Sequence, residues 1–209
     1  MPYDIIKTIN KDSEAVLIEK KSKFICNIFS IKTKENAQQK IKEIKKKYYD
    51  AKHHCFAFSV IEDGQKITRM NDDGEPSGTA GEPILNIILK NQLENVLIIV
   101  TRYFGGILLG TGGLTRAYSN SSLMALKNTQ IVTKQKGILA KIELNYIDNE
   151  KFKYYCSKND IRIINSEYNE NIVYTIELNN MQMNNLHNFQ NGEKKYKIIS
   201  FVKICQKYI

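Results

Sequence analysis

The segments NDDGEPSGTAGEP (Asn71–Pro83) and TRYFGGILLGTGGLTR (Thr101–Arg116) hold most of the glycines of this chain, and we name them the first and second glycine segments. Glycine loses more backbone entropy on folding than any other residue. Its concentration here therefore predicts positive-φ turns, or a backbone left bare so that another group can approach closely. The first segment also carries acids, among them Asp72, Asp73 and Glu75, and arginines bracket the second. This composition is more typical of a site than of a linker.

Together the two segments resemble a known family. DDGEPSGTAGEP followed by TRYFGGILLGTGGLTRAY is similar to the bacterial YigZ branch of the IMPACT family, an uncharacterised group whose eukaryotic relatives regulate translation. The resemblance extends to AKHHCFAF (residues 51–58) and, more loosely, to IINSEY (residues 163–168), so it covers most of the chain. It implies an α+β fold with an N-terminal domain like domain 2 of ribosomal protein S5. The implied C-terminal domain is ferredoxin-like and similar to a module of elongation factor G.

Length and composition indicate a folded globular protein. The 209 residues suffice for one large core or two small ones, and 42% of them are hydrophobic. No apolar run is long enough for a membrane span, and the N-terminus lacks the pattern of a signal peptide. We therefore expect a cytoplasmic protein with no membrane partner. The four cysteines form no CxxC pair, so we expect free thiols and predict neither a metal site nor a cofactor.

The net charge favours an anionic partner. Thirty-one basic residues stand against 22 acidic ones, which gives a formal charge of +9. A field of this sign attracts polyanions such as RNA or a ribosomal surface. The alternative is that the lysines only solubilise the chain, and the lysine-rich face of the helix expected over residues 33–49 is open to the same two interpretations.

Periodicity predicts the elements of an N-terminal domain over residues 1–133. Two strands are expected within residues 14–29, and a helix over residues 33–49 with Thr33 as its N-cap. Residues 53–70 form a hairpin that turns at Asp63-Gly64. A second helix starts at Pro83, a strand that is apolar on both faces covers residues 96–100, and a third helix runs from about Gly113.

A polar boundary at residues 129–136 precedes a C-terminal domain over residues 136–209. Its expected order is a strand (137–146), a helix (148–160), two strands (161–170 and 171–180), a helix (181–192) and a strand (195–205). The order βαββαβ is typical of a ferredoxin-like sandwich.

The second glycine segment is a candidate anion or nucleic-acid site. A glycine-rich turn that leads into a helix N-terminus exposes N–H groups and the positive end of the helix dipole, and a nearby arginine completes such a site. Its spacing matches neither a P-loop nor a dinucleotide-binding fingerprint. Tyr103 and Phe104 are expected to stack on an unpaired base. The candidate residues are Arg102, Tyr103, Gly105, Gly106, Gly110, Thr111, Gly112, Gly113 and Arg116.

The first glycine segment and the strand before it supply candidate acids and a base. Asp72, Asp73 and Glu75 either hold a divalent cation, or cap turns and pair with Arg102 and Arg116. His53 is the candidate base for the same site. Cys55 shares a strand face with His53, which allows a nucleophilic pair or, more simply, a buried thiol beside a hydrogen-bonded histidine. No residue is assigned a catalytic role.

Three functions remain open at this point. The first is a non-catalytic, translation-associated regulator that binds RNA or the ribosome. The second is an enzyme acting on a small phosphorylated substrate, because the fold that the resemblance implies also hosts kinases and dehydratases. It requires His53 to lie near the loop of Asp72 and Glu75. The third is a protein adaptor that works with the translation machinery, through an exposed apolar patch in the second glycine segment.

Overall fold

The computed structural model describes residues 3–191 and 197–209, with the side chains of residues 187–191 excepted. The chain forms two compact units, Met1–Thr133 and Lys134–Ile209. Both are mixed α/β, and the structure contains two five-stranded sheets whose neighbouring strands run antiparallel wherever a register is given. Five α-helices lie within the described residues.

The sheet of unit 1 has the strand order β2-β3-β6-β4-β5. The bounds are Ser13–Glu19 for β2, Ser22–Ser30 for β3, His53–Glu62 for β4, Gln65–Asn71 for β5 and Val96–Tyr103 for β6. The hairpin expected at Asp63-Gly64 is confirmed, since both residues take positive φ as a tight two-residue turn requires. The apolar run that begins β6 is central and fully buried, because helices cover both faces of the sheet there.

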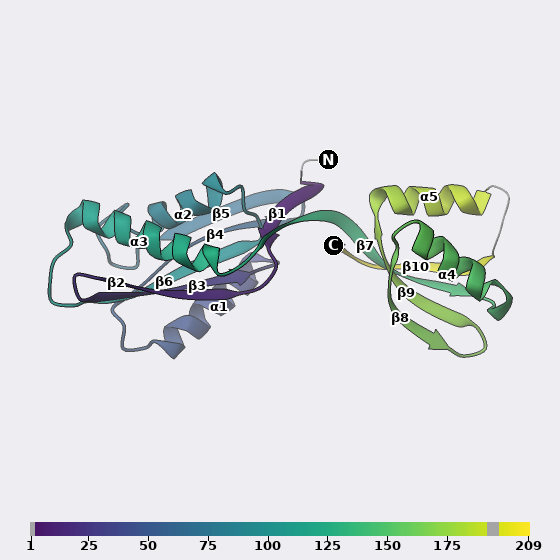
Figure 1. Ribbon diagram of the computed structural model, residues 1–209, viewed down its shortest axis with the longest axis horizontal. Helices are drawn as coiled ribbons and strands as arrows, with labels where there is room; N and C mark the ends of the chain where they lie inside the picture. The colour runs from purple at the N-terminus through teal and green to yellow at the C-terminus, as the bar shows by residue number, and fades with distance from the viewer. Residues whose placement is uncertain (1–2, 192–196) are drawn as a thin grey trace. The chain divides into compact units, whose positions relative to one another are not determined.

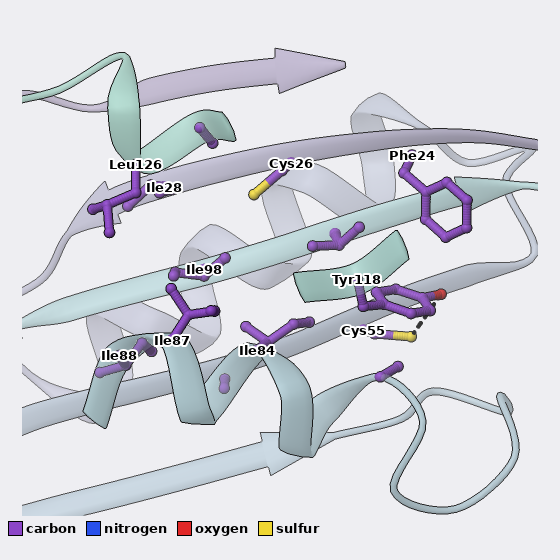
Figure 2. Packing of buried hydrophobic residues seen from close by; sticks show 14 of the residues in the cluster. Phe24, Cys26, Ile28, Cys55, Ile84, Ile87, Ile88, Ile98, Tyr118 and Leu126 are labelled. Carbon is purple, nitrogen blue, oxygen red and sulfur yellow. Dashed lines mark hydrogen bonds between the residues drawn. The ribbon is translucent and has the colours of Figure 1, made fainter. Parts of the chain in front are cut away.

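Helix α1 (Lys34–Lys47) covers one face of this sheet, while α2 (Gly81–Lys90) and α3 (Gly110–Lys127) cover the other (Figure 1). Thr33 caps α1 as expected, because its hydroxyl accepts a hydrogen bond from the backbone N–H of Asn36 at 3.1 Å. The larger core lies under α2 and α3, where the ring of Phe24 meets the ring of Tyr118 edge to face at 5.2 Å (Figure 2). This packing holds both helices against the strands that carry the candidate site.

Two helices begin earlier than the sequence predicts. Helix α2 starts at Gly81 rather than at Pro83, because a carboxylate oxygen of Asp72 accepts hydrogen bonds from the backbone N–H groups of Ala80 (3.0 Å) and Gly81 (2.8 Å). Helix α3 starts at Gly110 rather than at Gly113, so most of its glycines lie inside the first turn.

Unit 2 follows the predicted element order. Its elements are β7 (Ile131–Leu144), α4 (Asn149–Lys158), β8 (Arg162–Tyr168), β9 (Ile172–Asn179), α5 (Asn180–Asn191) and β10 (Ile198–Tyr208), and β7 starts just inside unit 1. The strand order is β10-β7-β9-β8, and Phe152, Tyr174 and Leu186 contribute to its core. A short strand that the sequence analysis missed, β1 (Ile5–Ile9), also pairs with β7. The predicted junction between the last helix and the last strand, residues 192–196, lies outside the described residues.

Candidate functional site

The second glycine segment forms an open loop between β6 and α3. Within it the side chains of Phe104 and Leu108 are 53% and 82% exposed. Gly106 and Gly110 have φ of +84° and +69°, and a Cβ added at either would meet no atom within 4 Å. These two glycines are therefore required by the backbone conformation and not by packing, so the space beside them stays open.

Gly105 anchors the same loop to the turn between β2 and β3. A Cβ added at Gly105 would lie 2.0 Å from the backbone carbon of Lys21, so only glycine fits. Its N–H also donates a hydrogen bond to the hydroxyl of Ser22 at 3.2 Å. The contact brings the β2–β3 turn beside the second glycine segment, and Lys20 and Lys21 in this turn are both exposed (Figure 1).

Helix α3 begins within this segment without a side-chain cap. Leu109 occupies the N-cap position and makes no capping hydrogen bond, while Gly110, Thr111 and Gly112 are exposed. Arg116 is exposed on the second turn and, within residues 3–191 and 197–209, forms no ion pair. The predicted pairing of Arg116 with the acids is therefore not found among the described residues.

Arg102 is buried at the end of β6. One of its terminal nitrogens lies 2.6 Å from a carboxylate oxygen of Glu75, and the two side chains are 7% and 4% exposed. The guanidinium carbon also lies 5.4 Å from the ring centre of Phe24 and 5.6 Å from that of Phe104. Arg102 thus joins the two glycine segments and supports the exposed Phe104 ring from beneath.

Glu75 and Tyr118 continue this polar cluster into the core. The same Glu75 oxygen accepts a hydrogen bond from the Tyr118 hydroxyl at 2.8 Å, and the Cys55 sulfur lies 3.3 Å from that hydroxyl (Figure 2). The Cys55 thiol donates to the backbone carbonyl of Asp72 at 2.9 Å. Burial raises the pKa of Cys55 to about 12, and it also raises the pKa of Tyr118. A thiol with so high a pKa is protonated near neutral pH, which favours the structural interpretation of Cys55 over the nucleophilic one.

The other two acids are also engaged with their own chain. Asp72 accepts hydrogen bonds from Gly78, Ala80 and Gly81 at the start of α2. Asp73 contacts the Lys45 amine at 2.8 Å and accepts the backbone N–H of His54 at 2.7 Å. Burial alone would raise the pKa of Asp73, but these two hydrogen bonds hold it below its ordinary value.

His53 lies against the first glycine segment, as the hypothesis of a shared site requires. Its Nδ1 is 2.9 Å from the backbone carbonyl oxygen of Asp73, and because that oxygen can only accept, Nδ1 carries the proton. A Cβ at Gly74 would lie 3.5 Å from the same ring nitrogen. The structure therefore brings His53, Asp72, Asp73 and Glu75 together around one loop.

Several residues of the site were not identified from the sequence. Ser22 and Lys21 come from a turn about 80 positions before the segment that they contact, and no local pattern marks them. Tyr118 lies on the apolar stripe of α3 with Leu114, where it is indistinguishable from an ordinary core residue. Tyr103 was included, but its hydroxyl donates to Asp50 at 2.7 Å, on the sheet face opposite to that of Arg102.

The described residues contain neither a metal-ligand cluster nor a membrane-spanning helix. In that part of the chain, no three His, Cys, Asp or Glu side chains are grouped so that they could hold a metal ion. No helix among the same residues is both long and apolar enough to cross a lipid bilayer.

Comparison with known proteins identifies relatives of both units. The Impact N-terminal domain model matches residues 20–126. The chain is similar to IMPACT family member YvyE of Bacillus subtilis, at 36% identity over 80% of this chain and 76% of the relative. It is also similar to IMPACT family member YigZ of Escherichia coli, at 34% identity over 76% of this chain and 78% of the relative. A solved crystal structure of a hypothetical protein matches with a TM-score of 0.64 and 27% identity, over 97% of this chain and 98% of that one.

Proposed function

The chain belongs to the IMPACT family, and from this premise we propose that it is a non-catalytic, translation-associated regulator that binds RNA or the ribosome in the cytoplasm. We assign residues 1–133 to a domain like domain 2 of ribosomal protein S5, and residues 136–209 to a ferredoxin-like domain. The strand order β10-β7-β9-β8 with helices α4 and α5 supports the second assignment.

One observation carries the proposal, namely the open surface at the end of the unit 1 sheet. The exposed part of the second glycine segment lies there beside the cations Lys20 and Lys21, and Arg116 projects from α3. Exposed cations with flexible stems can contact phosphate at a smaller desolvation cost than buried ones, whereas Asp72, Asp73 and Glu75 already have partners within the chain. The net charge of +9 adds long-range attraction of the same sign.

The structure changes the role that we propose for Arg102. A guanidinium that is paired with Glu75 and nine-tenths buried does not reach a phosphate at the surface. We propose that Arg102 positions the loop, and that Lys20, Lys21 and Arg116 contact the phosphates instead. Gly106 and Gly110, which face open space, then allow the backbone to approach the nucleic acid closely.

A second candidate function is favoured by one contact only. The enzyme hypothesis requires His53 to lie beside the first glycine segment, and the 2.9 Å contact with Asp73 meets that condition. However, Asp72, Asp73 and Glu75 are all engaged with backbone or cationic groups of their own chain. They would have to leave these partners before they could act on a substrate, so we propose the binding function in preference.

The test measures binding of the purified full-length protein to ribosomal subunits and to a mixed RNA pool at several salt concentrations. We expect saturable binding, with the logarithm of the binding constant falling steeply as the logarithm of the salt concentration rises. Arg116→Ala should reduce the magnitude of this slope by about 0.7. The control is Lys90→Ala, which removes an exposed cation at the C-terminal end of α2, at the opposite end of the sheet.

If Lys90→Ala weakened binding as much as Arg116→Ala, the attraction would be generic to a basic protein and the site assignment would be wrong. If neither RNA nor subunits bound, the adaptor function would replace this proposal. Pull-downs that resist nuclease treatment would then identify the protein partner.

A further inference from the structure

We infer that the partner of this surface is a single-stranded segment of RNA, whose unpaired bases stack on Phe104 and Tyr49. The inference rests on the proposed function, and it adds which form of nucleic acid is bound and which side chains distinguish it. It also assigns a role to Tyr49, which the sequence analysis did not consider.

Phe104 has the features of a stacking platform. Its ring is 53% exposed, and the buried guanidinium of Arg102 lies 5.6 Å from the ring centre. Arg102 is in turn fixed by Glu75, and the neighbouring Gly105 is anchored to the β2–β3 turn. The ring therefore has one supported side and one side open to solvent, and a base stacked on it would not have to order a mobile side chain.

Tyr49 supplies a second aromatic ring close to the same end of the sheet. It follows Tyr48, the C-cap of α1, and is 84% exposed. The next residue, Asp50, accepts the hydrogen bond from the Tyr103 hydroxyl, so the α1–β4 connection is linked to the end of β6. Tyr49 directly precedes Asp50, so this 2.7 Å hydrogen bond keeps the Tyr49 backbone near the end of β6.

Tyr103 directly precedes Phe104 but is not available for stacking itself. Its hydroxyl is already bonded to Asp50, and the ring is only partly exposed. Lys23 pairs with Tyr103 across the sheet, and Lys52 precedes His53, whose partner on β6 is Arg102. Both lysines are exposed, so cations flank Tyr103 at the end of β6.

This arrangement favours single-stranded over double-stranded RNA. In a duplex the bases are stacked on one another, and their faces do not reach isolated aromatic rings. A duplex could contact only the lysines and Arg116, through its phosphates. Discrimination between the two forms should therefore depend on the rings, while the salt dependence should depend on the cations.

The experiment compares a mixed-sequence RNA strand of about 12 nucleotides, a length within the range of single-strand binding sites, with the same strand annealed to its complement. Both are labelled, and binding is followed by fluorescence anisotropy with the full-length protein. We expect the single strand to bind more tightly. Phe104→Leu and Tyr49→Leu should each weaken single-strand binding about tenfold and leave duplex binding unchanged.

Leu108→Ala is the matched control, because it shortens an exposed apolar side chain of the same loop that has no ring. Binding by this variant should stay within about twofold of the unchanged protein, since no stacking is lost. All three side chains are exposed, so thermal unfolding should show that each variant folds as the parent does.

Equal binding of both RNA forms, unchanged by either ring substitution, would overturn this inference and leave the proposed RNA-binding function standing. A loss caused equally by Leu108→Ala would overturn it in favour of an apolar protein interface. Absence of binding to either RNA form would overturn both this inference and the RNA-binding function on which it rests.

Discussion

The two glycine segments are both rich in glycine but have opposite structural roles. In the first, Asp72, Asp73 and Glu75 bind backbone N–H groups, a lysine, an arginine and a tyrosine of their own chain. In the second, the glycines at 106 and 110 face open space, and the helix that follows has no side-chain cap. The first segment therefore links β4, α1, α2, β6 and α3 to one another through hydrogen bonds and ion pairs. The second is a surface.

The difference shows that glycine content alone does not separate a tight structural corner from a binding loop. What separates them is whether the polar groups already have partners within the chain. Gly105 illustrates the point inside the second segment itself, because it is held at 2.0 Å from a neighbouring backbone while Gly106, one residue later, is free of contacts. The following substitutions test this contrast, from the largest expected effect to the smallest.

Loss of the ion pair between Glu75 and Arg102 should have the largest effect on stability. Glu75→Ala leaves the Arg102 guanidinium buried without its counter-charge, which we expect to lower the free energy of unfolding by about 3–5 kcal/mol. Urea denaturation measures this value. Glu19→Ala, which removes an exposed acid at the end of β2, should change it by less than about 0.5 kcal/mol. Similar small effects for both variants would show that the contacts of the first segment do not stabilise the fold.

The adjacent glycines of the second segment should differ from each other. Gly105→Ala forces a Cβ against the backbone of Lys21, and we expect a loss of about 3 kcal/mol in the free energy of unfolding. Gly106→Ala meets no neighbour, but its φ of +84° costs about 1–2 kcal/mol for a residue with a Cβ. Thermal unfolding of both variants shows which one loses more stability. A larger loss of stability for Gly106→Ala would contradict the close contact between Gly105 and the backbone of Lys21.

The carboxylate of Asp73 should make part of the stability depend on pH. Because its pKa is lowered in the folded state, its contribution is present above the unfolded value of about 4 and is lost as the pH falls below it. Asp73→Asn should therefore be less stable than the parent by about 1–2 kcal/mol at pH 7. The difference should shrink toward zero near pH 2, as measured by urea denaturation at both pH values. A difference that did not change with pH would contradict the ion pair with Lys45.

Substitutions in the open surface should have the smallest effect on stability. The double variant Lys21→Ala/Arg116→Ala removes two exposed cations, so the free energy of unfolding should change by less than about 0.5 kcal/mol. The same variant should nevertheless reduce the salt slope of RNA binding by about 1.4, which is 0.7 for each phosphate contact on a single strand. A destabilised protein, or an unchanged slope, would show that these cations do not form the proposed surface.

Much of the fold was predictable because its signals are local. The alternation in β4, the Asp63-Gly64 turn, the capping threonine and the apolar run of β6 each fall within a few residues. The start of α2 was not predictable in this way, because its capping carboxylate belongs to Asp72, eight or nine residues upstream. Strand β1 was missed because it is only five residues long.

The candidate site was predictable as a location but not as a set of contacts. Sequence patterns identified both glycine segments and His53, yet three candidate acids and two arginines do not show which pairs form. The Arg102–Glu75 pair spans 27 positions, and it depends on how far β6 and the first segment extend. The exposure of Arg116 and the burial of Arg102 likewise result from tertiary packing, which no local sequence pattern predicts.

The contrast between the two segments is tested most directly by amide hydrogen exchange of the full-length protein, with and without a saturating mixed-sequence single-stranded RNA. We expect the RNA to slow exchange of the backbone amides at residues 104–113. The first glycine segment, Asn71–Pro83, should exchange at the same rate in both samples, because its polar groups are already bound within the chain. Protection confined to the first segment, or unchanged exchange in the second, would contradict the assignment of the second segment as the RNA-binding surface.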